Sequence, residues 1–135
     1  MLLIFTFLLV AVQAQPTIFE NVQNLTDPTD GVEALSISDD NSIIVAGSHD
    51  DRVYVFVHDG TEYALSQTLT EMDNDVEVTD MTGDGKWLIV CGYDPDLYVY
   101  YNDNGFILNQ TLEGANLEIW AAGITDDHQW IVFGD

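Results

Sequence analysis

Residues 31–69 read GVEALSISDDNSIIVAGSHDDRVYVFVHDGTEYALSQTL, and residues 75–112 read DVEVTDMTGDGKWLIVCGYDPDLYVYYNDNGFILNQTL. The two stretches align along their whole length, and residues 117–135, LEIWAAGITDDHQWIVFGD, begin a third copy. Landmark residues recur every 42 to 45 positions, namely the glycines that close the second apolar run and the glutamines of the fourth (Gly47, Gly92, Gly134; Gln23, Gln67, Gln110). A period of about 40 to 45 residues, built from short apolar runs, is typical of β-propeller blades.

Each full copy contains four short runs rich in Val, Ile, Tyr and Leu, and such runs between clusters of Asp, Asn and Gly are predicted to be strands. Residues 17–25 are predicted to be a further strand of the fourth type. The strands predicted in the three copies are residues 32–38, 43–47, 52–57 and 64–69, then 77–82, 87–92, 97–101 and 106–112, and finally 119–124 and 130–134.

Turn residues explain why these strands fold back on one another. Asp84 and Gly85 separate two apolar runs, and Asp-Gly supplies a positive φ at low steric cost. Asp39-Asp40-Asn41 and Asp126-Asp127-His128 stand at the same place in the other copies. No stretch keeps the apolar spacing of three and four that a helix requires. We therefore expect an all-β fold: antiparallel four-stranded blades of an incomplete β-propeller, without a helix longer than two turns.

The stretch GSHDDRVYVF, residues 47–56, resembles the G-S-x-D-x-x-V-x-V-W segment of WD-repeat propellers, and residues 92–100 resemble a degenerate second copy. The closing Trp-Asp dipeptide of that family is replaced by Phe56-Val57 and Tyr100-Tyr101. The resemblance covers residues 17–135 and implies a divergent WD-like propeller. Such folds host many unrelated activities, so it indicates the fold better than the function.

Several side chains are expected to have structural roles. An aspartate in a tight turn can accept a hydrogen bond from its own backbone one or two residues on, which predicts that Asp50 and Asp94 fix their hairpins. Cys91 is expected in the core. Aromatic side chains of the second and third strands are expected to pack between blades (Tyr54, Phe56, Trp87, Tyr98, Tyr100, Trp130).

Composition excludes several classes of partner and site. The 135 residues carry 24 acidic against two basic side chains, a formal charge of −22, with 47% hydrophobic residues. That apolar content excludes a disordered acidic tail. Arg52 and Lys86 alone cannot neutralise a run of phosphates, so nucleic acid and anionic membrane surfaces are excluded as partners. The single cysteine excludes an intrachain disulfide framework and a cysteine-based zinc site.

The N-terminus carries the features of a secretory signal. Residues 1–12 form an apolar run too short to span a bilayer, and Val12 and Ala14 occupy the −3 and −1 positions of a cleavage site. We expect residues 1–14 to be a signal peptide, residues 15–135 to be the mature propeller segment, and the protein to be secreted or lumenal. A buried N-terminal strand and a signal anchor are the alternatives, and a membrane anchor would require a longer product. The sequons at Asn24 and Asn109 predict glycosylation in that compartment.

No coherent catalytic set emerges. Ser48-His49-Asp50 has the residue types of a hydrolytic triad, but consecutive residues in extended backbone point in alternating directions. Residues 82–87, TGDGKW, resemble part of the tryptophan-docking motif of quinoprotein dehydrogenases, yet they also stand where each copy has its first turn. Neighbouring acids leave a calcium site between blades open as an alternative to a solvated surface, and no other cofactor is expected (Asp39, Asp40, Asp73, Asp75, Asp94, Asp96, Asp126, Asp127).

Propellers usually close with about four to eight blades, whereas this sequence holds fewer than three repeats. We expect the chain to be the N-terminal part of a longer propeller or to close by assembling with other chains, with a tendency to self-associate. The favoured function is a secreted, non-catalytic scaffold that binds a protein or a glycan. The alternative is a quinoprotein-like or other propeller enzyme whose site requires further blades.

Overall fold

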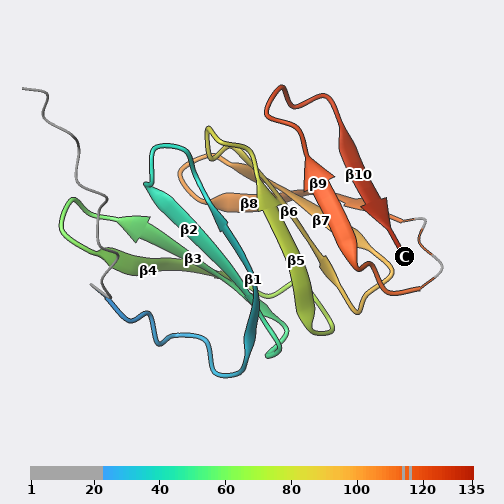
Figure 1. Ribbon diagram of the computed structural model, residues 1–135, viewed down its shortest axis with the longest axis horizontal. Helices are drawn as coiled ribbons and strands as arrows, with labels where there is room; N and C mark the ends of the chain where they lie inside the picture. The colour runs from blue at the N-terminus through green and yellow to red at the C-terminus, as the bar shows by residue number, and fades with distance from the viewer. Residues whose placement is uncertain (1–22, 114, 116) are drawn as a thin grey trace, which may run out of the picture.

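The computed structural model describes residues 23–113, 115 and 117–135. The predicted signal peptide, residues 1–14, and the first part of the predicted strand 17–25 lie outside the described residues. The described part of the chain contains strands and turns only (Figure 1), so no helix there is long and apolar enough to cross a membrane. The strands are β1 (Val32–Ile37), β2 (Ile43–Ser48), β3 (Arg52–His58), β4 (Tyr63–Leu69), β5 (Val76–Met81), β6 (Trp87–Gly92), β7 (Leu97–Asn102), β8 (Phe106–Leu112), β9 (Ala121–Ile124) and β10 (Ile131–Gly134).

The strands form two four-stranded antiparallel sheets, β1-β2-β3-β4 and β5-β6-β7-β8, and a two-stranded sheet, β9-β10. Each strand pairs with its neighbour in sequence, so every sheet is a meander. The sheets stack through their first strands, with β5 lying between β1 and β9 (Figure 1). The prediction of repeated four-stranded propeller blades is therefore confirmed. We call the sheets blade 1, blade 2 and blade 3 in chain order.

Most predicted strands differ from the observed ones by one residue at an end, and the differences at the two ends of the chain are larger or have a clear cause. Residues 23–25 are not in a strand, although they were expected to belong to one. The first strand of blade 3 begins at Ala121 rather than at residue 119, because Ile119 instead donates its backbone N–H to the carbonyl of Gly92 in blade 2. The second strand of blade 3 begins at Ile131, one residue later than expected.

The strand register also corrects the alignment of the repeats. Val32 pairs with Ser48 in blade 1, and Val76 pairs with Gly92 in blade 2. Gly92 is thus the counterpart of Ser48 rather than of Gly47, and Cys91 is the counterpart of Gly47. The error arose because matching glycine to glycine shifted this segment by one residue, whereas blade 1 and blade 2 share a constant offset through their first two strands.

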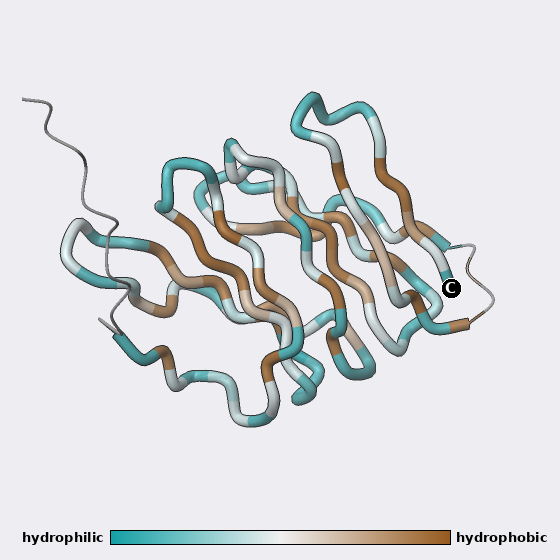
Figure 2. Tube along the Cα trace, viewed as in Figure 1, coloured by the Kyte–Doolittle hydropathy of each residue, from teal (hydrophilic) through white to brown (hydrophobic). Residues whose placement is uncertain are grey.

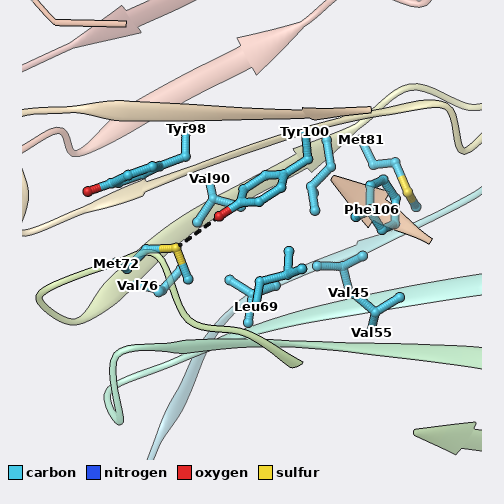
Figure 3. Packing of buried hydrophobic residues seen from close by; sticks show 12 residues of the cluster. Val45, Val55, Leu69, Met72, Val76, Met81, Val90, Tyr98, Tyr100 and Phe106 are labelled. Carbon is cyan, nitrogen blue, oxygen red and sulfur yellow. Dashed lines mark hydrogen bonds between the residues drawn. The ribbon is translucent and has the colours of Figure 1, made fainter. Parts of the chain in front are cut away.

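The strands carry most of the hydrophobic residues, whereas the loops that join them are mainly hydrophilic (Figure 2). The core between blades 1 and 2 contains Leu69, Met72 and Tyr100, and the Tyr100 hydroxyl lies 3.0 Å from Glu71 Oε2 and 3.5 Å from Met72 Sδ (Figure 3). Burial, with Glu71 nearby, raises the pKa of Tyr100. The other members of this core are Val45, Val53, Val55, Val76, Met81, Leu88, Val90, Tyr98 and Phe106.

A second cluster lies between blades 2 and 3. Cys91 is 1% exposed in it, as expected, and burial raises the pKa of its thiol to about 12. Trp87 packs against this cluster and contacts the Tyr101 ring at a centroid distance of 4.9 Å. The prediction that Trp130 also packs between blades is wrong, because this side chain is 67% exposed on a face that no described residue covers.

The first turn of each blade carries one residue in the left-handed region. The three counterparts are Asn41, Gly85 and His128, with φ of 59°, 69° and 60°. Asp84 supports this turn in blade 2 because its Oδ1 accepts hydrogen bonds from Thr82 Oγ1 at 2.7 Å and from the Lys86 backbone at 3.1 Å. The segment 82–87 is accordingly a tight turn between β5 and β6.

Candidate interaction site

Two aspartates tie the turn between the second and third strands to the loop that precedes the first strand. Asp50 Oδ2 accepts hydrogen bonds from the Thr29 backbone at 2.9 Å, from the Thr29 hydroxyl at 2.6 Å and from the Tyr54 hydroxyl at 2.6 Å. Asp94 accepts from the Asp73 backbone at 3.1 Å and from Asn74 Nδ2 at 2.7 Å. Each carboxylate therefore accepts bonds from residues 20 or 21 positions earlier, in the loop before the first strand. The expected bond to a backbone N–H one or two residues on is corrected: among the described residues, the partner of the Asp50 carboxylate within its own hairpin is the side chain of Tyr54.

Asp50 is held as a carboxylate. Partial burial opposes ionisation, but the hydrogen bonds from Thr29 and Tyr54 outweigh it and lower the pKa of Asp50 to about 2. Its second oxygen, Oδ1, is buried with no hydrogen-bond partner among the described residues. This aspartate positions the loop at residue 29 beside the first strand of blade 1.

That arrangement lies next to a cluster of polar side chains at the junction of blades 1 and 2. His49 Nε2 lies 3.1 Å from Glu77 Oε1 and 3.9 Å from Glu33 Oε1. The side chains of His49, Glu33 and Glu77 are 32%, 52% and 15% exposed, so the cluster is open to solvent on the Glu33 side. Ligand atoms of all three lie within 4.8 Å of one another.

β-Bulges bring the two glutamates together. The register of β1 against β2 shifts between Val32 and Ala34, and that of β5 against β6 shifts between Val76 and Val78. Glu33 and Glu77 are thus the extra residues of equivalent bulges, and a bulge redirects the side chain of its unpaired residue.

An exposed aromatic pair extends this cluster toward blade 3. Trp120 is 52% exposed and meets the ring of Tyr93 edge to face, at a centroid distance of 5.2 Å and an interplanar angle of 84°. The pKa of Tyr93 is raised, mainly by desolvation. Nearby carboxylates raise it further (Glu77, Asp75, Glu118, Glu33). We call Glu33, His49, Glu77, Tyr93 and Trp120 the rim cluster.

The chemistry of the rim cluster favours cations. Carboxylates attract ammonium and guanidinium groups, and the faces of exposed Trp and Tyr rings add a cation–π contribution. Glu33, His49 and Glu77 also offer oxygen and nitrogen ligands of the kind that divalent metals accept. The neighbouring acids considered for calcium in the sequence are not part of this group.

The three residues of the Ser48-His49-Asp50 sequence engage different partners. Ser48 is fully buried and its hydroxyl faces the Asp50 backbone N–H at 3.4 Å. The His49 ring faces Glu77, and the Asp50 carboxylate faces Thr29 and Tyr54. No relay runs from the hydroxyl through the imidazole to the carboxylate.

The two sequon asparagines lie on the surface. Asn109 is exposed on β8, and Asn24 is exposed in the segment before β1. Sequence reasoning missed the rim cluster because it gave no role to Glu33 and Glu77. The signal available in the sequence was that Glu33 and Glu77 stand at the same place in the two copies, directly after Val32 and Val76.

Comparison with known proteins places the fold among WD-repeat β-propellers. Residues 19–56 match the family described as WD domain, G-beta repeat. The structure is similar to the crystal structure of Saccharomyces cerevisiae Sqt1, with a TM-score of 0.65 and 18% sequence identity over 73% of this chain and 27% of that chain. The chain thus spans about a quarter of the length of Sqt1. No curated protein matches the sequence.

Proposed function

We propose that this chain is a non-catalytic interaction scaffold whose rim cluster binds a basic segment of a partner protein. The observation that carries the proposal is the exposed, edge-to-face Tyr93–Trp120 pair, with Tyr93 in the electrostatic field of four carboxylates that raise its pKa. A lysine or arginine side chain can stack on such a ring while its charge lies near carboxylates. The formal charge of −22 would also speed the encounter with a basic partner.

The proposal is tested with a fluorescent nine-residue peptide of alternating Arg and Ala, titrated with the purified protein at two salt concentrations. Trp120→Ala should weaken binding by about two- to fivefold, the range of an exposed cation–π contact. Glu33→Gln with Glu77→Gln should produce a similar loss and reduce the salt dependence.

A matched control neutralises two exposed acids elsewhere, Asp103→Asn with Glu62→Gln. This control should leave binding within about twofold of the unmodified protein, since distant exposed charges are largely screened. Equal losses in the control and in the rim variants would show that only overall charge attracts the peptide. The proposal would then fail.

A glycan is the second candidate ligand, because an exposed Trp120 ring beside carboxylates can stack on a sugar and accept bonds from its hydroxyls. The salt dependence of binding distinguishes the two ligands, because the binding of a neutral glycan does not depend on salt concentration. A glycan array read with wild type and Trp120→Ala protein tests this candidate.

We also propose that the protein enters the secretory pathway. The apolar segment before Ala14 and the two exposed sequon asparagines support the proposal. Expression of the full chain in a glycosylating host should give secreted protein that begins at Gln15 and carries glycan at Asn24 and Asn109. Retention of residues 1–14 with unshifted peptide masses at both asparagines would refute it.

A further inference from the structure

Three side chains of the rim cluster converge on one point at the junction of blades 1 and 2. His49 Nε2 lies 3.1 Å from Glu77 Oε1 and 3.9 Å from Glu33 Oε1, and ligand atoms of all three lie within 4.8 Å of one another. Among the described residues this is the one group of three or more side chains that could share a metal ion. An imidazole nitrogen and two carboxylate oxygens together select a narrower range of cations than carboxylates alone.

Backbone contacts fix the positions of these side chains. The His49 N–H donates to the carbonyl of Gly31 at 2.9 Å, and the neighbouring Asp50 is bonded to the same loop before β1. The two glutamates are the extra residues of bulges in β1 and β5, so hydrogen-bonded strands carry them. The Glu77 side chain is 15% exposed, whereas that of Glu33 is 52% exposed and can rotate. Two of the three groups are therefore held in place before any ligand binds.

The equivalent positions at the junction of blades 2 and 3 hold aromatic residues. The strand register puts Tyr93 where blade 1 has His49, and Trp120 where blade 2 has Glu77. These two rings are in contact, at a centroid distance of 5.2 Å. The fold thus brings the two positions together at both described junctions, and the meeting of a histidine with carboxylates is particular to blades 1 and 2.

The separations between the ligand atoms suit a small tetrahedral ion. Zinc binds histidine nitrogen and carboxylate oxygen at about 2.0 to 2.2 Å, which places its ligand atoms about 3.4 Å apart. The two distances from His49 Nε2, 3.1 Å and 3.9 Å, lie on either side of that value. Rotation of the exposed Glu33 side chain can bring the third atom closer. The nitrogen ligand disfavours calcium and magnesium, which prefer oxygen.

We propose that Glu33, His49 and Glu77 bind a Zn²⁺ ion that links blade 1 to blade 2. The protein ligands are Nε2 of His49 and one oxygen of each glutamate, and a water on the exposed Glu33 side completes the tetrahedron. The charge of the ion balances the two carboxylates. Because the ligands come from both blades, binding stabilises the folded protein. The inference does not rest on the proposed binding of a basic segment, although the two share residues.

The test titrates Zn²⁺ into the purified protein, freed of metal with a chelator, in a calorimeter. The unmodified protein should bind one ion per chain, and its melting temperature should rise with the zinc concentration. His49→Gln should weaken zinc binding by at least about 100-fold, because loss of a residue that merely orients a ligand already costs about 10- to 100-fold. Glu77→Gln should weaken it by at least about tenfold.

His128→Gln is the matched control, because His128 Nε2 lies 3.3 Å from a single carboxylate, that of Asp84. This variant should keep its zinc affinity within about twofold, since the two sites share no residue. In nitrogen NMR spectra, one equivalent of zinc should shift the Nε2 signal of His49 and leave those of His58 and His128 in place. Co²⁺ should give the visible absorption bands of a tetrahedral site in the unmodified protein and not in His49→Gln.

Three outcomes would overturn the proposal: no zinc binding by the unmodified protein, equal affinity of His49→Gln, or equal losses in His49→Gln and His128→Gln. Melting temperatures measured with chelator show whether each variant is folded, so loss of binding is not confused with loss of structure. The zinc titration contains no peptide, and the peptide titration of the proposed function is run with chelator. Each proposal can therefore fail without the other.

Discussion

Replacing Asp50 by Asn removes the charge on which three hydrogen bonds converge while it keeps the size of the side chain. Thr29 and Tyr54 lose a charged acceptor, and Tyr54 is only 4% exposed, so its hydroxyl has little access to water. The new amide group would also lie where Oδ1 has no described partner. We expect the variant to be less stable at pH 7.

The magnitude follows from the pKa of Asp50. A lowering from the ordinary 3.8 to about 2 corresponds to roughly 2 kcal/mol in full. Asp50 is partly exposed, and screening by solvent reduces this to about 1 kcal/mol. Because the pKa is lower in the folded state, the contribution is complete above pH 3.8 and is lost as the pH falls toward 2.

The assay is urea unfolding followed by tryptophan fluorescence, for wild type and Asp50→Asn, at pH 7, 4 and 2.5. The difference in unfolding free energy should be about 1 kcal/mol at pH 7 and should fall to about a third of that value at pH 2.5. All other carboxylates are common to both proteins, so their titration cancels in the difference. Asp103→Asn, an exposed change of the same charge, should have an effect below about 0.5 kcal/mol. A difference that is absent at pH 7, or that stays constant with pH, would refute the role assigned to Asp50.

Three further changes test the packing between strands and blades. Gln67→Ala should destabilise the fold by roughly 1 to 3 kcal/mol, because it strips both partners from the buried backbone of Phe106, and unfolding midpoints in urea measure this. Gly92→Ala should destabilise it by roughly 2 kcal/mol or more in thermal unfolding, since a Cβ there would lie 2.1 Å from the Asp75 carbonyl oxygen; equal melting temperatures would contradict that contact. Leu88→Ala should lower the free energy of unfolding, measured in urea, by roughly 2 to 5 kcal/mol because Leu88 is fully buried. A loss below about 1 kcal/mol would show a loosely packed core.

The architecture was predictable because its determinants are local. Strand alternation and the turn residues Asp84 and Gly85 are properties of a few consecutive positions, and repetition made each of them visible more than once. The register at Gly47 and Gly92 was not predictable by matching identical residues, because the pairing of β5 with β6 sets it.

The rim cluster could not be predicted for a different reason. Glu33 and Glu77 come from strands β1 and β5 of two blades, and two bulges turn them toward His49, which lies in the turn after β2. The bonds from Asp50 to Thr29 likewise span 21 residues. The sequence shows that Gln23 and Gln67 recur at equivalent places. It does not show that they bond to the backbones of Tyr63 and Phe106, which lie 40 and 39 residues further on.

The meander order of the sheets has a consequence for how the chain folds. Every strand pairs with a neighbour in sequence, so each blade can form from local contacts by rapid hairpin closure as it leaves the ribosome. The hydrogen bonds of Gln23 to Tyr63 and of Gln67 to Phe106 instead close loops of 40 and 39 residues. Closing such a loop costs more entropy than closing a hairpin turn. We therefore expect docking of one blade on the next to be slower than hairpin closure, and Gln67→Ala should lower the folding rate more than a substitution within a hairpin turn.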